Sequence, residues 1–168
     1  MASVTLRGNP FNLAGEMPKV GDTAPDFNLT GSDMAPITKA SLAGKKKVIV
    51  TVPSLDTPVC QMETRKFNEQ ATALGDNVVV VIASIDTPMA AKRFCTTEGL
   101  ERVKSGSDVR DRDFGKRWGV GIAEGPLAGF TARAVFVVDE NDKVTYTELV
   151  PEIANEPNYD AALAALKA

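Results

Sequence analysis

Two cysteines and the absence of histidine define the chemistry that this sequence could perform. Cys60 follows the string Asp-Thr-Pro-Val, where an apolar, β-branched run gives way to an amphipathic helical pattern, and Cys95 is the only other cysteine. The chain contains no histidine, so the imidazole base that many nucleophilic enzymes use is missing. If the chain is a catalyst, we expect its reagent to be a thiolate that a helix start and a guanidinium activate.

The residues before Cys60 have the signature of a helix start. With Thr57 as N-cap and Pro58 as the first helical residue, Cys60 is predicted at the third helical position. Backbone N–H groups there have no intrahelical partner, and the helix dipole favours an anion. A helix start stabilises an anion by only about 0.3–1 kcal/mol, which is too little to keep a thiol ionised at neutral pH, so a cation must help. Without histidine, that cation has to be arginine or lysine.

Both cysteines also fit a purely structural interpretation. Cys60 shares one predicted helical face with Phe67 and Leu74, which is the spacing of a small core residue. Cys95 lies one turn beyond Ala91 in its own predicted helix, which equally suits a core position. From the residues alone, catalysis and core packing stay open for each cysteine.

The predicted elements alternate between strands and helices. A buried strand at 47–52, a helix from Pro58 to about Leu74 and a strand at 78–85 form a parallel βαβ unit. Thr87 and Pro88 repeat the same helix-start chemistry and open the helix that carries Cys95. The other predicted elements are a hairpin at 4–8 and 11–14 around Asn9 and Pro10, a strand at 27–30, a helix at 111–118, a Gly-rich connection at 119–129, a hairpin at 134–138 and 144–149, and a last helix from Pro157.

Together these elements predict an α/β sandwich with a mixed sheet. With 43% apolar and 24% charged residues, the chain suits one compact domain over residues 1–168, on which the hairpin within residues 1–15 is a decoration. The net charge of −3 lacks the basic footprint of a nucleic-acid-binding protein. The first twenty residues lack a secretory signal pattern, and the apolar run at 78–83 is too short to span a membrane. We therefore expect a soluble, cytoplasmic protein whose cysteines are kept reduced.

Other chemical sites are disfavoured. Two cysteines without histidine cannot form a structural zinc site, and no C-x-x-C motif is present. Asp108, Asp111 and Asp113 lack the spacing and the closing glutamate of a calcium loop. The glycines at 119, 121 and 125 neither follow a clear strand nor open a helix, which argues against a phosphate-binding loop. We expect no metal.

A longer pattern extends the cysteine motif. Residues 53–60, PSLDTPVC, match the Pro-x-x-x-Thr-x-x-Cys signature of the peroxiredoxin family. Essentially the whole chain, including RFCTTEGL, GVGIAEGPLAGFTARAVFVVDENDKV and EPNYDAALAALKA, resembles the atypical two-cysteine subgroup of bacterial thiol peroxidases. The resemblance implies a thioredoxin-like fold and an enzyme that reduces hydrogen peroxide and organic hydroperoxides. No metal, haem or flavin is implied.

The resemblance also implies roles for individual residues. Cys60 is the peroxidatic cysteine, and Cys95 is the resolving cysteine that closes an intramolecular Cys60–Cys95 disulfide. Thr57 orients the peroxide, Arg133 supplies the missing cation and Pro53 shields the pocket. From the residues alone, these three would be a helix cap, a surface arginine and a strand-ending proline. The implied partners are hydroperoxides, thioredoxin as reductant and a second copy of the chain in a homodimer.

The two helix starts lead to a mechanical expectation. Cys60 is near its helix start, whereas Cys95 is about seven residues into its own helix, or roughly 10 Å along the axis. A disulfide needs Cα atoms about 4.4–6.8 Å apart. We therefore predict that one or both helices unwind locally before the bridge closes.

Two other functions stay open on the sequence. The first is a redox sensor on the same fold, in which peroxide switches a Cys60–Cys95 pair that a partner protein reads. The second is a protein with a structural disulfide, which would gain on the order of 3–4 kcal/mol from closing a loop of this length. Rapid turnover with a thioredoxin system distinguishes an enzyme from both.

Overall fold

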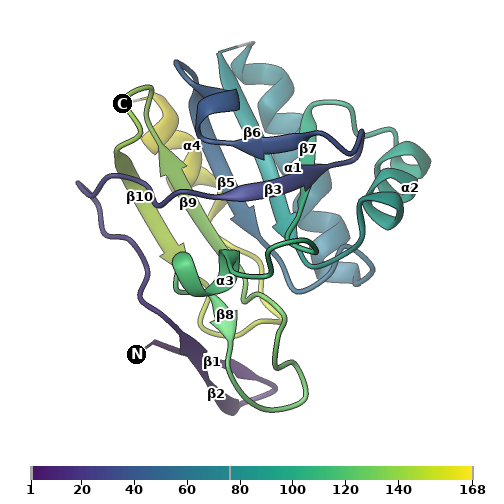
Figure 1. Ribbon diagram of the computed structural model, residues 1–168, viewed down its shortest axis with the longest axis vertical. Coiled ribbons are helices and arrows are strands. Elements are labelled where there is room, and N and C mark those ends of the chain that lie inside the picture. Colours follow the sequence, from purple (N-terminus) through teal and green to yellow (C-terminus); the bar gives the residue numbers. More distant parts are fainter. Residues whose placement is uncertain (1, 76, 168) are drawn as a thin grey trace.

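The centre of the molecule is a mixed sheet. The computed structural model describes residues 2–75 and 77–167, and its seven-stranded sheet has the order β10-β9-β5-β6-β7-β3-β4 (Figure 1). These strands are β3 (Asn28–Gly31), β4 (Pro36–Thr38), β5 (Lys46–Thr51), β6 (Val78–Ser84), β7 (Val103–Ser107), β9 (Ala134–Val138) and β10 (Val144–Leu149). Strands β5, β6 and β7 are parallel, and the other neighbours are antiparallel. The predicted α/β fold with a mixed sheet is confirmed.

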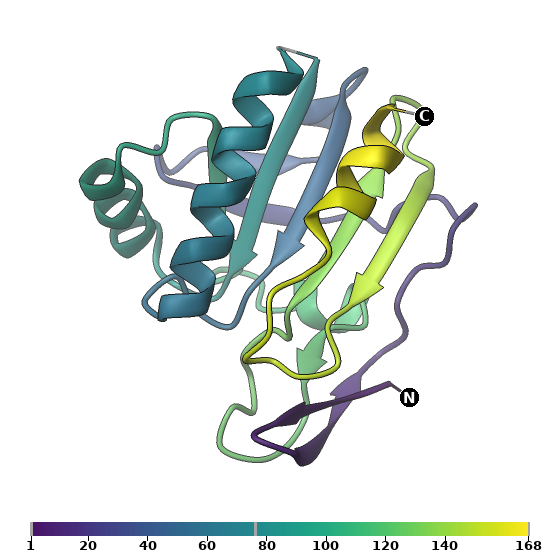
Figure 2. The ribbon, with the colours of Figure 1, turned by 180° about the vertical axis from the view of Figure 1, so that it is seen from behind.

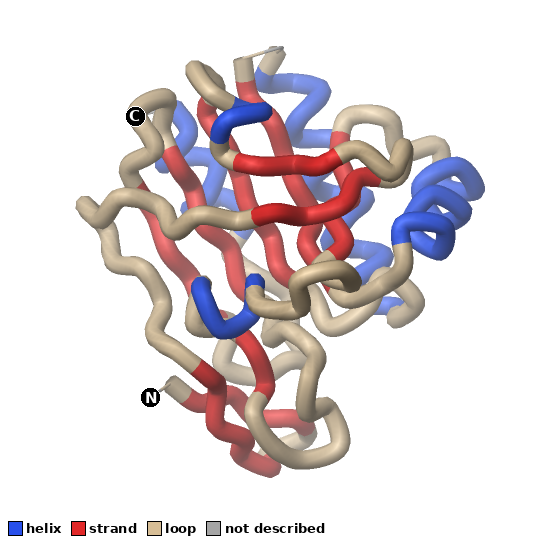
Figure 3. The backbone as a smooth tube through the Cα atoms, in the orientation of Figure 1, coloured by secondary structure: helices blue, strands red, loops and turns tan. Residues whose placement is uncertain are grey.

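Helices pack on both faces of this sheet. They are α1 (Pro58–Leu74), α2 (Pro88–Glu98), α3 (Phe114–Arg117), α4 (Tyr159–Lys167) and the 3-10 turn η1 (Ala40–Leu42). Figure 2 shows α1 and α4 over one face, where Phe67 and Ala162 join buried residues of the sheet. Figure 3 shows the short α3 and η1 on the opposite face, where Trp118 packs against Phe136. Each face of the sheet therefore has its own apolar core.

The N-terminal hairpin is present, but its turn differs from the prediction. Strands β1 (Ser3–Leu6) and β2 (Asn9–Ala14) form a small second sheet with β8 (Gly121–Ile122). The turn is made by Arg7 and Gly8, which have φ values of 51° and 82°, as a two-residue hairpin turn requires. Asn9 and Pro10, where the turn was predicted, already belong to β2. That residues 1–168 form a single domain stays a prediction.

Several predicted boundaries were wrong for local reasons. The helix predicted at 111–118 begins only at Phe114, because Arg112 has a φ of 56° and cannot be helical. The last helix begins at Tyr159 and not at Pro157. Strands β4 and β7 were not predicted, because β4 is only three residues long and β7 reads VKSGS, which has little β propensity. Tertiary pairing with β6 and β3 makes β7 a strand.

Candidate active site

Cys60 lies in the first turn of α1, at the third helical position. Thr57 is the N-cap residue with an extended backbone, Pro58 follows, and Gln61 makes the first helical hydrogen bond, from its N–H to the Thr57 carbonyl at 3.0 Å. The N–H groups of Val59 and Cys60 therefore have no intrahelical acceptor and face the same end of the helix. The Cys60 side chain is fully buried. The helix dipole at this position favours negative charge.

The hydroxyl of Thr57 has a different partner from the one expected of a helix cap. It donates to the Ser54 carbonyl at 3.0 Å and makes no capping bond. Thr87, at the start of α2, does cap its helix, accepting from the Ala90 N–H at 3.2 Å. Because a hydroxyl has only one proton, the Thr57 oxygen can act only as an acceptor toward any further ligand. Pro53 is buried in the same loop, between β5 and α1.

Arg133 reaches the site from the segment that leads into β9. The backbone of this segment is tied to the end of β5 by two buried hydroxyls. Thr131 donates to the Val52 carbonyl at 2.6 Å, and Thr51 donates to the Ala132 carbonyl at 2.7 Å. The end of β5 also leads into α1, so these bonds hold Arg133 next to the helix that carries Cys60.

The guanidinium of Arg133 contacts the Cys60 sulfur directly. Its Nη1 lies 3.3 Å from Cys60 Sγ and 2.5 Å from Glu63 Oε2, and its Nε donates to the Ile153 carbonyl at 2.9 Å. Arg133 is only 2% exposed, so it is not a surface arginine. Burial lowers the pKa of Arg133, but the negative charges of Glu63 and Cys60 outweigh burial and raise that pKa above its usual value. The site therefore contains a permanent cation against the thiol.

Glu63 is a site residue that the sequence analysis missed. Its side chain is fully buried, its Oε2 binds Arg133, and its Oε1 has no hydrogen-bond partner among the described residues. The available signal was its spacing, because a residue three positions after Cys60 lies on the same helical face. Cys60 and Glu63 thus share one guanidinium nitrogen.

The buried carboxyl of Glu63 makes stability depend on pH. Burial raises the pKa of Glu63 from 4.5 to about 7, against the opposing effect of Arg133. The folded state therefore binds this proton more tightly than the unfolded state, and the resulting stabilisation is complete below about pH 4.5 and lost as pH rises through about 7. Between pH 5 and pH 8, we expect the free energy of unfolding of the natural chain to fall by about 2–3 kcal/mol relative to that of Glu63→Gln.

Urea denaturation of both proteins at the two pH values measures this difference. The glutamine variant is the control, because it retains every other titrating group, including the partly buried Asp108. Parallel pH dependence of the two proteins would show that Glu63 does not titrate in this range.

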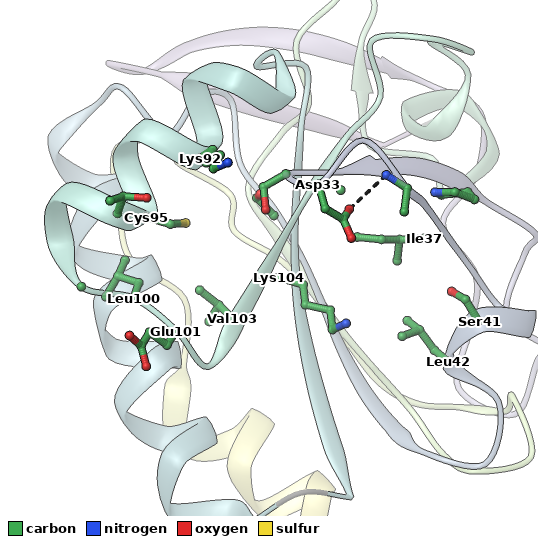
Figure 4. A pocket seen from close by; sticks show the side chains of 17 residues that line it. Asp33, Ile37, Ser41, Leu42, Lys92, Cys95, Leu100, Glu101, Val103 and Lys104 are labelled. Carbon is green, nitrogen blue, oxygen red and sulfur yellow. Dashed lines mark hydrogen bonds between the residues drawn. The ribbon is translucent and has the colours of Figure 1, made fainter.

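Cys95 lies on α2 and forms no disulfide with Cys60. Both are free thiols, and Cys95 lines a cavity of about 530 Å³ between α2, β7 and the β3–β4 hairpin, across from Asp33 and Ile37 (Figure 4). A different face of α2 lines a second cavity of about 530 Å³ toward the start of α1. Its lining includes Ser54, Leu55 and Gln61 on the α1 side and Ala90, Phe94 and Thr97 on α2. Burial raises the pKa of the Cys95 thiol, so Cys95 is neutral where it lies.

Within residues 2–75 and 77–167, no three Cys, Asp or Glu side chains gather so that they could hold a metal ion. Among the helices that the structure describes, none combines the length and the apolar character needed to cross a bilayer.

Comparison with known proteins identifies the family. Residues 19–163 match the Redoxin family. The chain belongs to this family. A thiol peroxidase of Leptospira interrogans is 49% identical over 170 aligned residues, covering 100% of this chain and 99% of that protein. A thiol peroxidase of Mycobacterium tuberculosis is 52% identical over 168 residues, covering 100% of both chains.

Solved structures agree with this membership of the Redoxin family. A peroxiredoxin-like protein from Aquifex aeolicus superposes with a TM-score of 0.93 at 45% identity, covering 99% of this chain and 96% of that one. The thioredoxin-like peroxiredoxin fold implied by the resemblance is confirmed. With thiol peroxidases at about half identity over its full length, the chain is a peroxidase of the peroxiredoxin type. Such a Redoxin enzyme takes a peroxide as substrate and a thiol as reductant.

Proposed function

We propose that this peroxidase reduces hydrogen peroxide and organic hydroperoxides through Cys60, resolves the product with Cys95 and is recycled by thioredoxin. The observation that carries the proposal is the 3.3 Å contact between Arg133 Nη1 and the buried Cys60 sulfur at a helix start. The Arg133 guanidinium and the N–H groups of Val59 and Cys60 supply positive potential at the sulfur, and the chain contains no histidine that could do so.

The first step is a two-electron oxidation of Cys60. The thiolate attacks the terminal oxygen of the hydroperoxide, so that an S–O bond forms while the O–O bond breaks. Sulfur becomes a sulfenic acid, and the second oxygen leaves as hydroxide or alkoxide, which takes up one proton, equal to the one that the thiol released on ionisation, to give water or an alcohol. Negative charge grows on that leaving oxygen, and the Arg133 guanidinium and the N–H groups of the first turn are suited to stabilise it.

Thr57 and Pro53 have supporting roles in this proposal. Because the Thr57 hydroxyl already donates to Ser54, its oxygen is available to accept the O–H of the bound hydroperoxide. Such a bond would orient the O–O axis toward sulfur. Pro53 is buried beside the loop and lacks an N–H group, which suits a residue that excludes water from the thiolate.

Resolution requires α2 to change shape. The Cys95 thiolate must attack the Cys60 sulfenic sulfur, releasing water and forming the disulfide. The face of α2 toward α1 carries Ala90, Phe94 and Thr97, whereas Cys95 faces the other cavity. The N–H of Leu100 donates to the Cys95 carbonyl at 2.9 Å within the C-terminal cap of α2, so unwinding from this end would release Cys95. Unwinding would also expose the thiol and remove the burial that raises its pKa.

Thioredoxin would then open the disulfide by thiol–disulfide exchange, with its own dithiol oxidised in return. The choice of thioredoxin, a homodimeric assembly and a cytoplasmic location are parts of the proposal that rest on the resemblance to bacterial thiol peroxidases.

The decisive experiment is peptide mass mapping after oxidation. The fully reduced protein receives one equivalent of hydrogen peroxide and is quenched within seconds by a thiol-blocking reagent. We expect a Cys60–Cys95 disulfide, faster hydrogen exchange in the last turn of α2 than in the reduced protein, and continuous peroxide consumption when a thioredoxin system is added. Two blocked, unoxidised thiols would refute the proposal. Rapid disulfide formation without turnover would favour the sensor.

A further inference from the structure

One carboxylate joins the loops that precede the two cysteine helices. Asp86 lies between the end of β6 and Thr87, the N-cap of α2. Its Oδ2 accepts from the Leu55 N–H at 2.7 Å and from the Ser84 hydroxyl at 2.8 Å, and its Oδ1 accepts from the Ser54 hydroxyl at 2.8 Å. Two of these three donors belong to the loop between β5 and α1, so Asp86 holds that loop from the neighbouring strand.

Asp86 is itself anchored to two strands. Its N–H donates to Ser84 Oγ at 3.2 Å, and its carbonyl accepts from the Ser107 hydroxyl at 2.5 Å. Ser84 ends β6 and Ser107 ends β7, and both serines are buried. The carboxylate is thus fixed by the edge of the parallel sheet, which makes it a rigid support for the loop that it binds.

The hydrogen bonds continue from Asp86 to Thr57. Ser54, whose hydroxyl binds Asp86, also accepts the Thr57 hydroxyl proton at its carbonyl. Its own hydroxyl oxygen accepts from the Asp56 N–H at 3.1 Å, closing the turn between the two residues. A displacement of Ser54 would therefore change where the Thr57 oxygen points.

We propose that Asp86 is a positioning residue for peroxide reduction, which fixes the Ser54–Thr57 turn so that the Thr57 hydroxyl presents only its acceptor side to the hydroperoxide. The inference rests on the proposed function, because it assumes that the hydroperoxide binds beside Cys60. Asp86 also ties the loop before α1 to the N-terminal end of α2. This end of α2 stays in place while the C-terminal end unwinds.

The chemistry of the contact calls for a carboxylate. An ionised aspartate is an acceptor at both oxygens, and three donors converge on it here. Asparagine has the same shape but replaces one oxygen with a donor, so Asp86→Asn cannot serve all three. Asp139 offers a matched control, because it accepts from the N–H groups of Asn141 and Lys143, both at 2.9 Å, in the β9–β10 turn.

The test compares two reactions of one thiol. In a Cys95→Ser background Cys60 is the only cysteine, and its second-order rate constants with hydrogen peroxide and with iodoacetamide are measured separately. Alkylation needs the thiolate but no oriented peroxide. For Asp86→Asn we expect the peroxide rate constant to fall about tenfold and the alkylation rate constant to change by less than about twofold, since a small misplacement of a catalytic group costs up to about a hundredfold. For Asp139→Asn we expect neither to change.

Other outcomes are distinguishable. Equal losses in both rate constants, or no loss in either, would overturn the positioning role of Asp86. If Asp86→Asn does not fold, Ser54→Ala removes one donor and leaves the carboxylate; it should lower the peroxide rate constant about threefold without slowing alkylation, and the same two failures would overturn the role. Slow reaction of the Cys95→Ser parent with peroxide would instead refute the proposed function.

Discussion

Replacement of Cys60 by serine should reduce peroxide turnover to the rate of the uncatalysed reaction, the largest effect expected from any single substitution. A serine hydroxyl at this position is neither ionised at neutral pH nor oxidised by peroxide, so no covalent intermediate can form. Loss of a nucleophile costs an enzyme at least about a thousandfold in rate. Peroxide consumption with a thioredoxin system measures the effect. The change is nearly isosteric, so the variant should remain folded in the buried cluster that contains Cys60.

Cys95→Ser is the matched control for this experiment. It removes the other thiol of the chain but leaves the contact between Arg133 and Cys60 intact. We expect this variant to consume one equivalent of peroxide rapidly and to form no intramolecular disulfide. If Cys60→Ser retained turnover while Cys95→Ser lost the first equivalent, the roles of the two cysteines would be reversed.

Arg133→Lys should slow the oxidation of Cys60 by about a hundredfold. The guanidinium serves three groups from one planar fork, namely Cys60 Sγ, Glu63 Oε2 and the Ile153 carbonyl. A lysine ammonium is a single point charge that cannot reproduce this geometry. The loss of one preorganised donor to a developing oxyanion typically costs about 10²–10³ in rate. Single-turnover oxidation of the reduced protein by hydrogen peroxide measures it.

The substitution retains a positive charge so that Glu63 keeps a counter-ion in the core. Removing the charge altogether would leave a buried carboxylate alone, which destabilises a protein by about 3–5 kcal/mol and would confuse rate with folding. Arg117→Lys is the control, because Arg117 pairs with Asp113 on the exposed surface of α3 and should affect neither rate nor stability. An unchanged oxidation rate in a folded Arg133→Lys variant would rule out transition-state stabilisation by the guanidinium fork.

In the proposed mechanism, two sources of positive potential replace the missing histidine. Positive potential comes from the start of α1 and from a buried arginine that Glu63 holds in place. Glu63 competes with the Cys60 sulfur for the same guanidinium nitrogen of Arg133. It also fixes the direction of a side chain that would otherwise have several rotamers.

Local sequence was sufficient for the features that depend on neighbouring residues. Helix α1 was predicted with the bounds that the structure has, because Thr57 and Pro58 form a helix start and an apolar face follows. The order strand, helix, strand predicted the parallel β5-α1-β6 unit. Two β-type runs around a polar turn predicted the β9–β10 hairpin. The absence of histidine, together with two cysteines, by itself favours a thiolate as the reagent.

The residues by themselves left open which cation, acid and anchor lie at the site; the resemblance implied Arg133, and only the tertiary structure placed Glu63 beside it and Asp86 beside the loop before α1. No spacing rule could select Arg133 from 19 lysines and arginines, because its place beside Cys60 results from the antiparallel pairing of Thr51 in β5 with Ala134 in β9. Likewise, no local pattern indicates that the Asp86 carboxylate turns from the end of β6 to the loop that follows β5. Contacts between segments far apart in sequence depend on which strands are neighbours, and the pairing of β5 with β9 is a property of the packed sheet that local patterns do not encode.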